Sequence, residues 1–144
     1  VILGSLYNGK NAPPYTADSK NNIKAIVTRS RMKVEFDDGK KSITLDTPAG
    51  NTILINDTGK SIEIRDQNQN RIGLSSAGIT LQSSKDLSIS AGGNISIASK
   101  ADVTISGQNV KASAAVGFAA KGDATAELTA SGETTVKGAM VRIN

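Results

Sequence analysis

Pairs of apolar residues, each separated by one polar residue, recur along the chain from about residue 43 onward. Successive pairs begin nine or ten residues apart at first, and then eight residues apart with occasional sevens. The pairs are Ile43/Leu45, Ile53/Ile55, Ile62/Ile64, Ile72/Leu74, Ile79/Leu81, Leu87/Ile89, Ile95/Ile97, Val103/Ile105, Val110/Ala112, Phe118/Ala120, Ala126/Leu128, Thr134/Val136 and Val141/Ile143. Alternation over three residues followed by a kink is typical of a short β-strand with one buried face.

The residues between the pairs favour turns over helices. Gly, Asn and Asp tolerate the positive φ angles that tight kinks require, and β-branched residues with intervening Gly, Asn and Ser disfavour a helix. A turn-former stands directly before many pairs, at Asp86, Asn94, Asp102, Asn109 and Gly117. Helical repeats are also much longer, at above about thirty residues. The pattern therefore predicts an all-β protein, a β-helix with one strand per repeat.

Three zones follow from this reading: residues 1–17, a turn-rich segment; residues 18–42, connecting strands; and residues 43–144, the repeat. In the second zone, residues 24–28 and 32–36 are strand-like, and Asp38-Gly39 closes the second of them, so we expect a strand pair. The chain begins inside an apolar run without a positively charged region, which indicates a piece of a longer protein rather than a secretion signal.

The composition excludes several classes of function. The chain has two Phe, two Tyr and no Trp, so burial must come from many small repeated contacts. It has no Cys and no His, which removes disulfides, thiolate metal sites and the commonest general base. No apolar stretch reaches the ~20 residues that span a bilayer. We expect no catalytic residues, no metal and no cofactor.

The net charge of +4 is distributed evenly along the chain. Residues 1–84 contain 11 Lys/Arg and 8 Asp/Glu, and residues 85–144 contain 6 and 5. There is no basic block, and aromatic side chains that could stack on bases are scarce. We therefore expect no nucleic-acid partner.

The periodicity leaves open whether one chain or three build the β-helix. One chain could close a three-sided coil in about three repeats, but the thirteen pairs would then make only about four coils with few bulky residues inside. The repeat also continues to the last residues without a polar capping repeat. Both features favour an intertwined triple-stranded β-helix, or β-prism, formed by an obligate homotrimer.

Several segments resemble one family in order along the chain. Residues 1–8 resemble the end of the OB-fold domain in VgrG spike proteins of type VI secretion systems and in the related phage central tail spike. Residues 50–53, 60–66 and 92–97 resemble the needle that follows this domain, and residues 137–144 resemble its blunt end. The resemblance implies that an OB-fold end (residues 1–17) and connecting strands (18–42) precede a trimeric β-helical needle (43–144).

The resemblance also implies a function and partners. Such a needle punctures a target cell envelope, driven by a contractile machine through an inner tube protein that binds the upstream part of the full-length protein. It is assembled in the bacterial cytoplasm and then injected or secreted. A PAAR-repeat tip protein binds the blunt end, which here would be Met140, Val141, Ile143 and Asn144. Met140 could equally be core filler. The alternative function is the stem of a passive trimeric fibre or adhesin.

Other motifs are better interpreted as turns than as sites. Residues 66–70 open like a calcium loop but lack its later Gly and Glu, and residues 59–61 resemble the end of a P-loop without its upstream Gly. Residues 92–94 suggest a corner, and the acidic pair at 37–38 should face opposite sides of a strand. The Ala-rich stretch at 112–126 could narrow the shaft or be a locally irregular segment.

Overall fold

The computed structural model describes residues 13–16 and 19–143, and these residues contain β-strands and no helix. The predicted all-β class is confirmed. The chain divides into two compact units, residues 1–93 and 94–144, which are considered separately below. Of the predicted OB-fold end at 1–17 only residues 13–16 are described, and Asn144 also lies outside the described residues.

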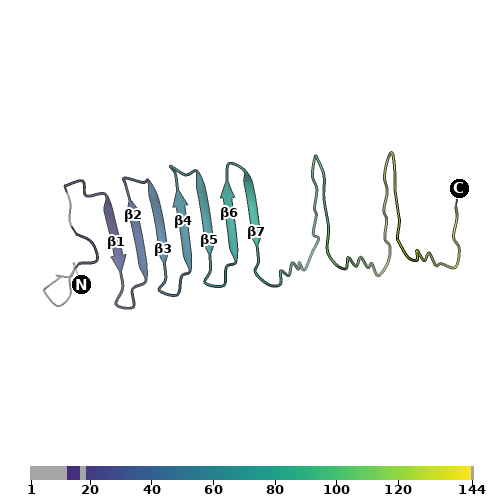
Figure 1. Ribbon diagram of the computed structural model, residues 1–144, viewed down its shortest axis with the longest axis horizontal. Helices are drawn as coiled ribbons and strands as arrows, with labels where there is room; N and C mark the ends of the chain where they lie inside the picture. Colours follow the sequence, from purple (N-terminus) through teal and green to yellow (C-terminus); the bar gives the residue numbers. More distant parts are fainter. Residues whose placement is uncertain (1–12, 17–18, 144) are drawn as a thin grey trace. The chain divides into compact units, whose positions relative to one another are not determined.

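The first unit contains one antiparallel sheet of seven strands, in which each strand pairs with the next one along the chain (Figure 1). The strands are β1 (Ile23–Val27), β2 (Lys33–Asp37), β3 (Ser42–Asp46), β4 (Thr52–Asn56), β5 (Ser61–Arg65), β6 (Arg71–Ser75) and β7 (Gly78–Gln82). The expected strand pair is β1 and β2, which confirms that prediction. β3 pairs with β2 along its whole length, so the sheet continues across the predicted zone boundary at 42/43.

The register places the alternating apolar residues on one face of the sheet in two rows. We call these residues the apolar stripe: Ile26, Val34, Leu45, Ile53, Ile64, Ile72 and Leu81 in one row, and Phe36, Ile43, Ile55, Ile62, Leu74 and Ile79 in the other. The opposite face, which we call the polar face, carries Glu35, Thr44, Leu54, Glu63 and Thr80 along its middle row. Because side chains alternate along a strand, a pairing slip by one residue would reverse both faces.

The turns along one edge of the sheet share a local design. The first residue of each turn accepts a hydrogen bond from the backbone N–H four residues later, at Thr28 (from Met32), Thr47 (from Asn51) and Asp66 (from Asn70). These caps stand 19 residues apart, at positions 28, 47 and 66. The left-handed residues Arg31, Gly50 and Gln69 have the same spacing. Two strands and two turns therefore form a 19-residue structural unit.

Neighbouring turns on the same edge are also hydrogen-bonded to one another. The Gln67 amide donates to Asn51 Oδ1 at 3.2 Å, and the Ser84 amide donates to Asn70 Oδ1 at 3.0 Å. On the other edge, Thr58 Oγ1 donates to the Lys40 carbonyl at 2.8 Å. The turns thus extend the hydrogen bonding of the strands and fix both edges of the sheet.

The chain changes character after β7. Among the described residues from 83 to 143 there is no strand (Figure 1). No hydrogen bond joins two backbone groups of these residues. Position 85, the next in the 19-residue series, is Lys85, whose ammonium cannot accept a capping hydrogen bond. The spacing of apolar pairs shortens to eight here, too short for the four- or five-residue turns that join β1 through β6, although β6 and β7 pair across only two residues at 76–77. The strands expected at 87–143 do not form among the described residues.

Candidate functional site

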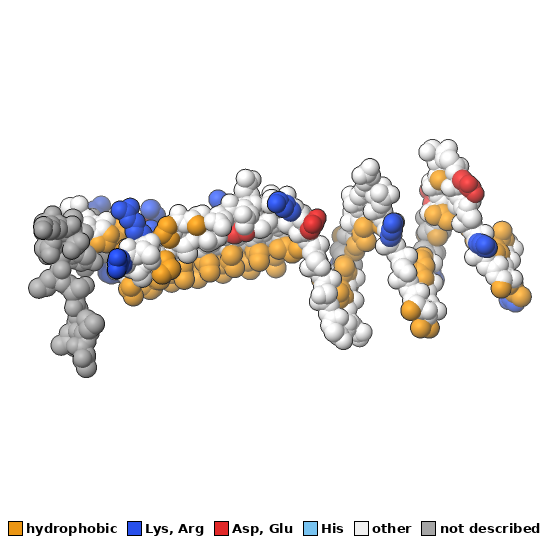
Figure 2. Space-filling model, turned by 90° about the horizontal axis from the view of Figure 1, so that it is seen from below, with side chains coloured by type: hydrophobic (Ala, Val, Ile, Leu, Met, Phe, Trp, Pro, Cys, Tyr) orange, Lys and Arg blue, Asp and Glu red, His pale blue; other side chains and the backbone are white. Residues whose placement is uncertain are grey.

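The apolar stripe is uncovered along the whole sheet. Eight of its side chains, from Phe36 on β2 to Leu74 on β6, keep between 37% and 42% of their surface exposed. No hydrophobic residue in the described part of the chain is buried. Figure 2 shows the stripe as a continuous band of apolar side chains along the sheet. Soluble monomers rarely expose contiguous apolar patches larger than a few hundred Å², so this face is a candidate assembly surface.

The total accessible surface leads to the same conclusion. The chain exposes 13829 Å², whereas a folded monomer of 14.8 kDa is expected to expose only about 7000 Å². A single copy therefore leaves exposed about half of the surface that folding normally removes from water. The large exposed surface therefore leaves room for burial against a partner.

A shallow apolar hollow lies over one row of the stripe. It has a volume of about 490 Å³, and its walls include Ile26, Met32, Leu45, Ile53 and Ile64. Polar residues such as Lys33 and Asp46 also border it, but polar groups contribute little to its lining. The hollow is part of the uncovered stripe and belongs to the same surface.

The polar face is held by ion pairs between neighbouring strands. Lys33 on β2 bonds to Asp46 on β3 at 2.9 Å and to Glu35 on its own strand at 3.2 Å. The hydrogen bond to Asp46 is the largest cause of a raised pKa at Lys33, which stays protonated. The Glu35 side chain is only 17% exposed. A carboxylate is thus better covered than the isoleucines across the sheet, the reverse of the usual order in soluble proteins.

Glu63 holds a second charge cluster at the other end of this face. Its carboxylate accepts a hydrogen bond from Arg65 Nε at 2.5 Å and pairs with Arg71 on β6. The bond from Arg65 lowers the pKa of Glu63. Gly73 lies opposite Glu63, and a Cβ there would meet the Arg71 guanidinium at 3.5 Å. A side chain at Gly73 would therefore lie in ordinary van der Waals contact with Arg71.

Two candidate chemical motifs are structural in this chain. Asp37 is 7% exposed and accepts a hydrogen bond from the Lys40 amide at 2.9 Å, and this bond is the largest cause of its lowered pKa. Its neighbour Asp38 pairs with Lys24 instead, so the two carboxylates share no cleft. They lie where β2 ends and its turn begins, as predicted.

Residues 66–70 form the β5–β6 turn, which confirms the turn interpretation. The Asp66 carboxylate accepts bonds from both the amides and the side-chain NH₂ groups of Asn68 and Asn70. Burial raises the pKa of Asp66, but these bonds outweigh it and the pKa is lowered overall. In the described residues no group of three or more His, Cys, Asp or Glu side chains is arranged to hold a metal ion.

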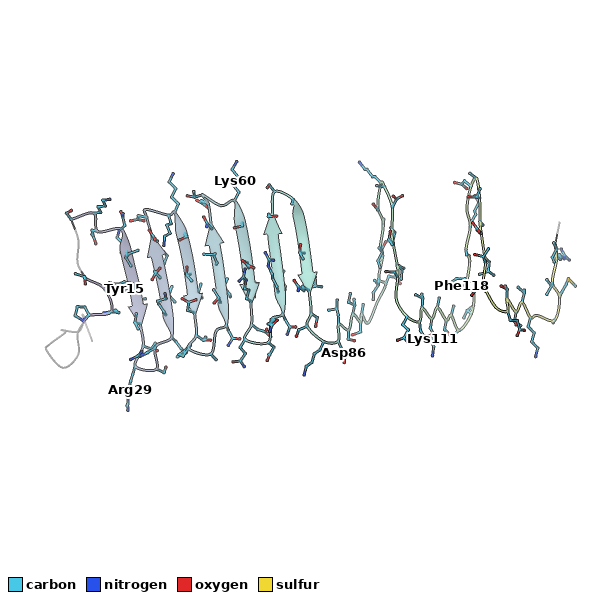
Figure 3. The ribbon with its side chains drawn as sticks, viewed as in Figure 1. Tyr15, Arg29, Lys60, Asp86, Lys111 and Phe118 are labelled. Atoms are coloured by element: carbon cyan, nitrogen blue, oxygen red, sulfur yellow. The ribbon has the colours of Figure 1, made fainter. Side chains whose placement is uncertain are left out.

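Tyr15 fixes the segment before β1 to the polar face. Its hydroxyl donates to the Glu35 carboxylate, and burial together with this bond raises the pKa of the phenol. At the two edges of the sheet, the Arg29 and Lys60 side chains point away from the strands (Figure 3). Gly59 and Lys60, with a left-handed φ of 48° at Lys60, lie in the β4–β5 turn, and Ser61 begins β5, so this motif is a turn rather than a phosphate-binding loop.

In the second unit the apolar pairs are present but unpaired. Ile97 and Ile105 are 76% and 73% exposed, and Phe118 lies open within the Ala-rich stretch (Figure 3). Their backbone groups have no backbone partner among the described residues. A strand-like segment with unpaired N–H and C=O groups is a template for pairing with another chain.

The residues predicted as a tip platform lie together at the end of the second unit. Met140, Val141 and Ile143 are all exposed, and Arg142 Nε donates to Met140 Sδ at 3.3 Å. Asn144, the fourth member, lies outside the described residues. Three adjacent apolar side chains are thus open to a partner, and nothing further distinguishes them from the earlier apolar pairs.

Sequence reasoning missed the cross-strand charge clusters and the turn caps. The caps did leave a signal, since Thr28, Thr47 and Asp66 recur every 19 residues. The charge clusters left none, because pairing Lys33 with Asp46 requires the register of β2 and β3.

No protein-family model matches the chain, and a search of curated proteins gives no match either. No helix among the described residues has the length and apolar character needed to cross a membrane.

Proposed function

We propose that three copies of this chain assemble into a rigid β-structured spike that pierces a target envelope at the front of a contractile injection machine. The uncovered apolar stripe carries this proposal. The rigid trimer is argued from the stripe and the unpaired second unit. The puncturing role comes from the resemblance of the sequence to VgrG needles.

An identical chain is the partner that fits both surfaces. The stripe is two rows of aliphatic side chains with little polar character, so it requires a dry, equally aliphatic partner such as another copy of itself. The unpaired repeat at 94–143 requires neighbours with the same eight-residue period, which another copy supplies along its whole length. Three chains can surround one axis with their stripes facing inward and their polar faces outward.

Rigidity would follow from continuous hydrogen bonding. Stacked strands lie about 4.8 Å apart, and each one restrains the next through its backbone ladder. The turn-to-turn bonds, such as Gln67 to Asn51, add restraint at the edges. In the first unit the longest segments between strands contain five residues, so little of the chain there is free to bend. A stiff rod transmits an axial push, whereas a flexible chain would buckle.

The exposed side chains at the end of the second unit support a docking role. We place the PAAR-repeat tip protein on Met140, Val141, Ile143 and Asn144, of which the first three are exposed. The inner tube protein would bind the upstream part of the full-length protein. The spike would be assembled in the bacterial cytoplasm and then injected or secreted, acting on the envelope without catalysis.

Assembly is tested by sedimentation equilibrium and native mass spectrometry of the purified chain. We expect a single species of three times the chain mass that survives heating in detergent. A stable species at the mass of one chain would refute the proposal.

Docking is tested by a pull-down with PAAR-repeat proteins. The double variant Val141→Asp/Ile143→Asp should remain trimeric and lose PAAR binding, because two carboxylates would be buried without partners. The matched control Thr104→Asp/Ser106→Asp adds the same charge at polar positions beside Ile105 and should bind normally. Binding that survives in the first variant would show that the platform is misplaced. If the trimer bound no PAAR-repeat protein and cargo delivery did not depend on the trimer, the chain would instead be the stem of a passive fibre or adhesin.

A further inference from the structure

We infer that the β1–β7 sheet is the assembly nucleus that sets the register of residues 94–143, so that the second unit orders only after three sheets have met. This inference rests on the proposed trimer and adds an order of assembly to it. In a single chain the first unit lacks only cover for its apolar side chains, whereas the described residues of the second unit lack backbone hydrogen-bond partners.

The first unit already satisfies the backbone of its strands. All seven strands are paired within the chain, and the turns are closed by caps such as Thr47 and Asp66. What it lacks is cover for the side chains of the apolar stripe. Local antiparallel hairpins form quickly because the contacts are close in sequence. Each chain can therefore form its sheet and expose the apolar stripe before it meets another copy.

The second unit lacks backbone partners altogether. The described residues from 94 to 143 form no backbone–backbone hydrogen bond. Ordering such a segment costs about 1–2 kcal/mol per residue in backbone entropy, and nothing within the chain offsets that cost. It can order only by pairing with other chains, so its folding depends on their prior proximity.

The second unit also specifies its own register only weakly. Its apolar pairs recur every eight or occasionally seven residues, for example Ile95/Ile97 and Val103/Ile105, so a slip of one repeat again brings most apolar pairs together. Strands that are weakly specified in this way are prone to alternate pairings. A separate element must therefore align the chains before residues 94–143 of different copies pair.

The sheet has the irregular landmarks that such alignment needs. Phe36 is the only aromatic residue of the apolar stripe, and Lys24 stands opposite it on β1, where the row would otherwise continue with an apolar residue. A slip between copies would place Phe36 against an aliphatic strand and bring the Lys24 ammonium over the stripe. Lys24 is paired with Asp38, and moving that ion pair out of water onto aliphatic side chains carries a desolvation cost, so one alignment of the three sheets is preferred.

The experiment uses the full chain, unfolded in denaturant and refolded by dilution, with pulsed hydrogen exchange read by mass spectrometry. We expect amides of 23–82 to gain protection first, and amides of 94–143 to gain it later, at a rate that rises with protein concentration. If 94–143 gained protection first or at the same time in a trimeric protein, the inference would be overturned while the proposed trimer stood. A protein that is monomeric at every concentration would overturn both.

Three variants test the direction of dependence. Ile55→Lys places a charge in the apolar stripe and should abolish the trimer and all protection in 94–143. Thr44→Lys adds the same charge on the polar face of the neighbouring strand and should change neither. Ile97→Lys, in the second unit, should lose protection in 94–143 but keep a trimer protected over 23–82. Loss of the sheet in Ile97→Lys, or protection of 94–143 in Ile55→Lys, would show that assembly of the sheet does not precede ordering of 94–143.

Discussion

Truncation of Ile64 to alanine measures how much of the trimer is held by the apolar stripe. Ile64 lies on β5 between Ile53 and Ile72 and keeps 41% of its surface exposed in one chain. Fully burying an isoleucine contributes about 1.5–3 kcal/mol. The part still to be gained on assembly is thus about 0.6–1.2 kcal/mol per chain, or about 2–4 kcal/mol for three chains.

That energy converts to a shift in the assembly equilibrium. Since 1.4 kcal/mol corresponds to a factor of ten, Ile64→Ala should weaken the equilibrium between three monomers and a trimer roughly 30- to 700-fold. Sedimentation equilibrium over a dilution series measures this constant directly. The melting temperature of the variant should also depend more steeply on protein concentration, because assembly is linked to folding.

Leu54 provides the matched control for this measurement. It lies on β4, next to β5, but on the polar face opposite Glu63. Leu54→Ala removes a similar side chain and should lower stability without changing the assembly constant. Equal effects of the two substitutions on assembly, or no effect of Ile64→Ala, would mean that the apolar stripe is not the surface that the copies share.

Three further predictions concern the sheet itself. Asp66→Ala removes the acceptor that caps the β5–β6 turn and should lower the melting temperature, whereas Asp123→Ala at an exposed ion pair should not; equal melting temperatures would contradict the capping role. The pKa of Glu63 is lowered from its ordinary 4.5 in the folded chain, so its stabilising effect is present above that value and is lost as pH falls through the lower folded pKa. Melting curves between pH 6 and 2 (a range of about four units around the carboxyl pKa values) should therefore show less acid destabilisation in Glu63→Gln. Gly50 has a φ of 93°, and its change to alanine should cost about 1–2 kcal/mol in denaturant titrations, while Gly92→Ala should be neutral.

The strands and their faces could be read from the sequence because alternation determines which side chains share a face. Ile43 and Leu45 predicted a strand with one apolar side, and β3 has that side in the apolar stripe. Asp38-Gly39 likewise marked the end of β2 and its turn. These features are local, and local sterics and periodicity decide them.

The pairing within the chain could not be read in the same way. Alternation does not say which neighbour a strand pairs with, so residues 43–82 were expected to belong to a β-helix, whereas in one chain they continue the antiparallel sheet of β1 and β2. The caps at Thr28, Thr47 and Asp66 decide this, because each closes a turn that reverses the chain. Among the described residues beyond β7, the same alternation yields no strand. The tip platform at Met140, Val141 and Ile143 stays a prediction.

The 19-residue spacing of the caps has a consequence for how the length of such a protein can change. Each 19-residue module contains two strands and returns the chain to the same edge with the same direction. Duplication or deletion of one whole module would alter the length of the sheet and leave every other residue facing as before. Gain or loss of a single strand would instead reverse the direction of every following strand, because neighbouring strands are antiparallel. The length of the sheet can therefore change in steps of one 19-residue module without altering which side chains share a face.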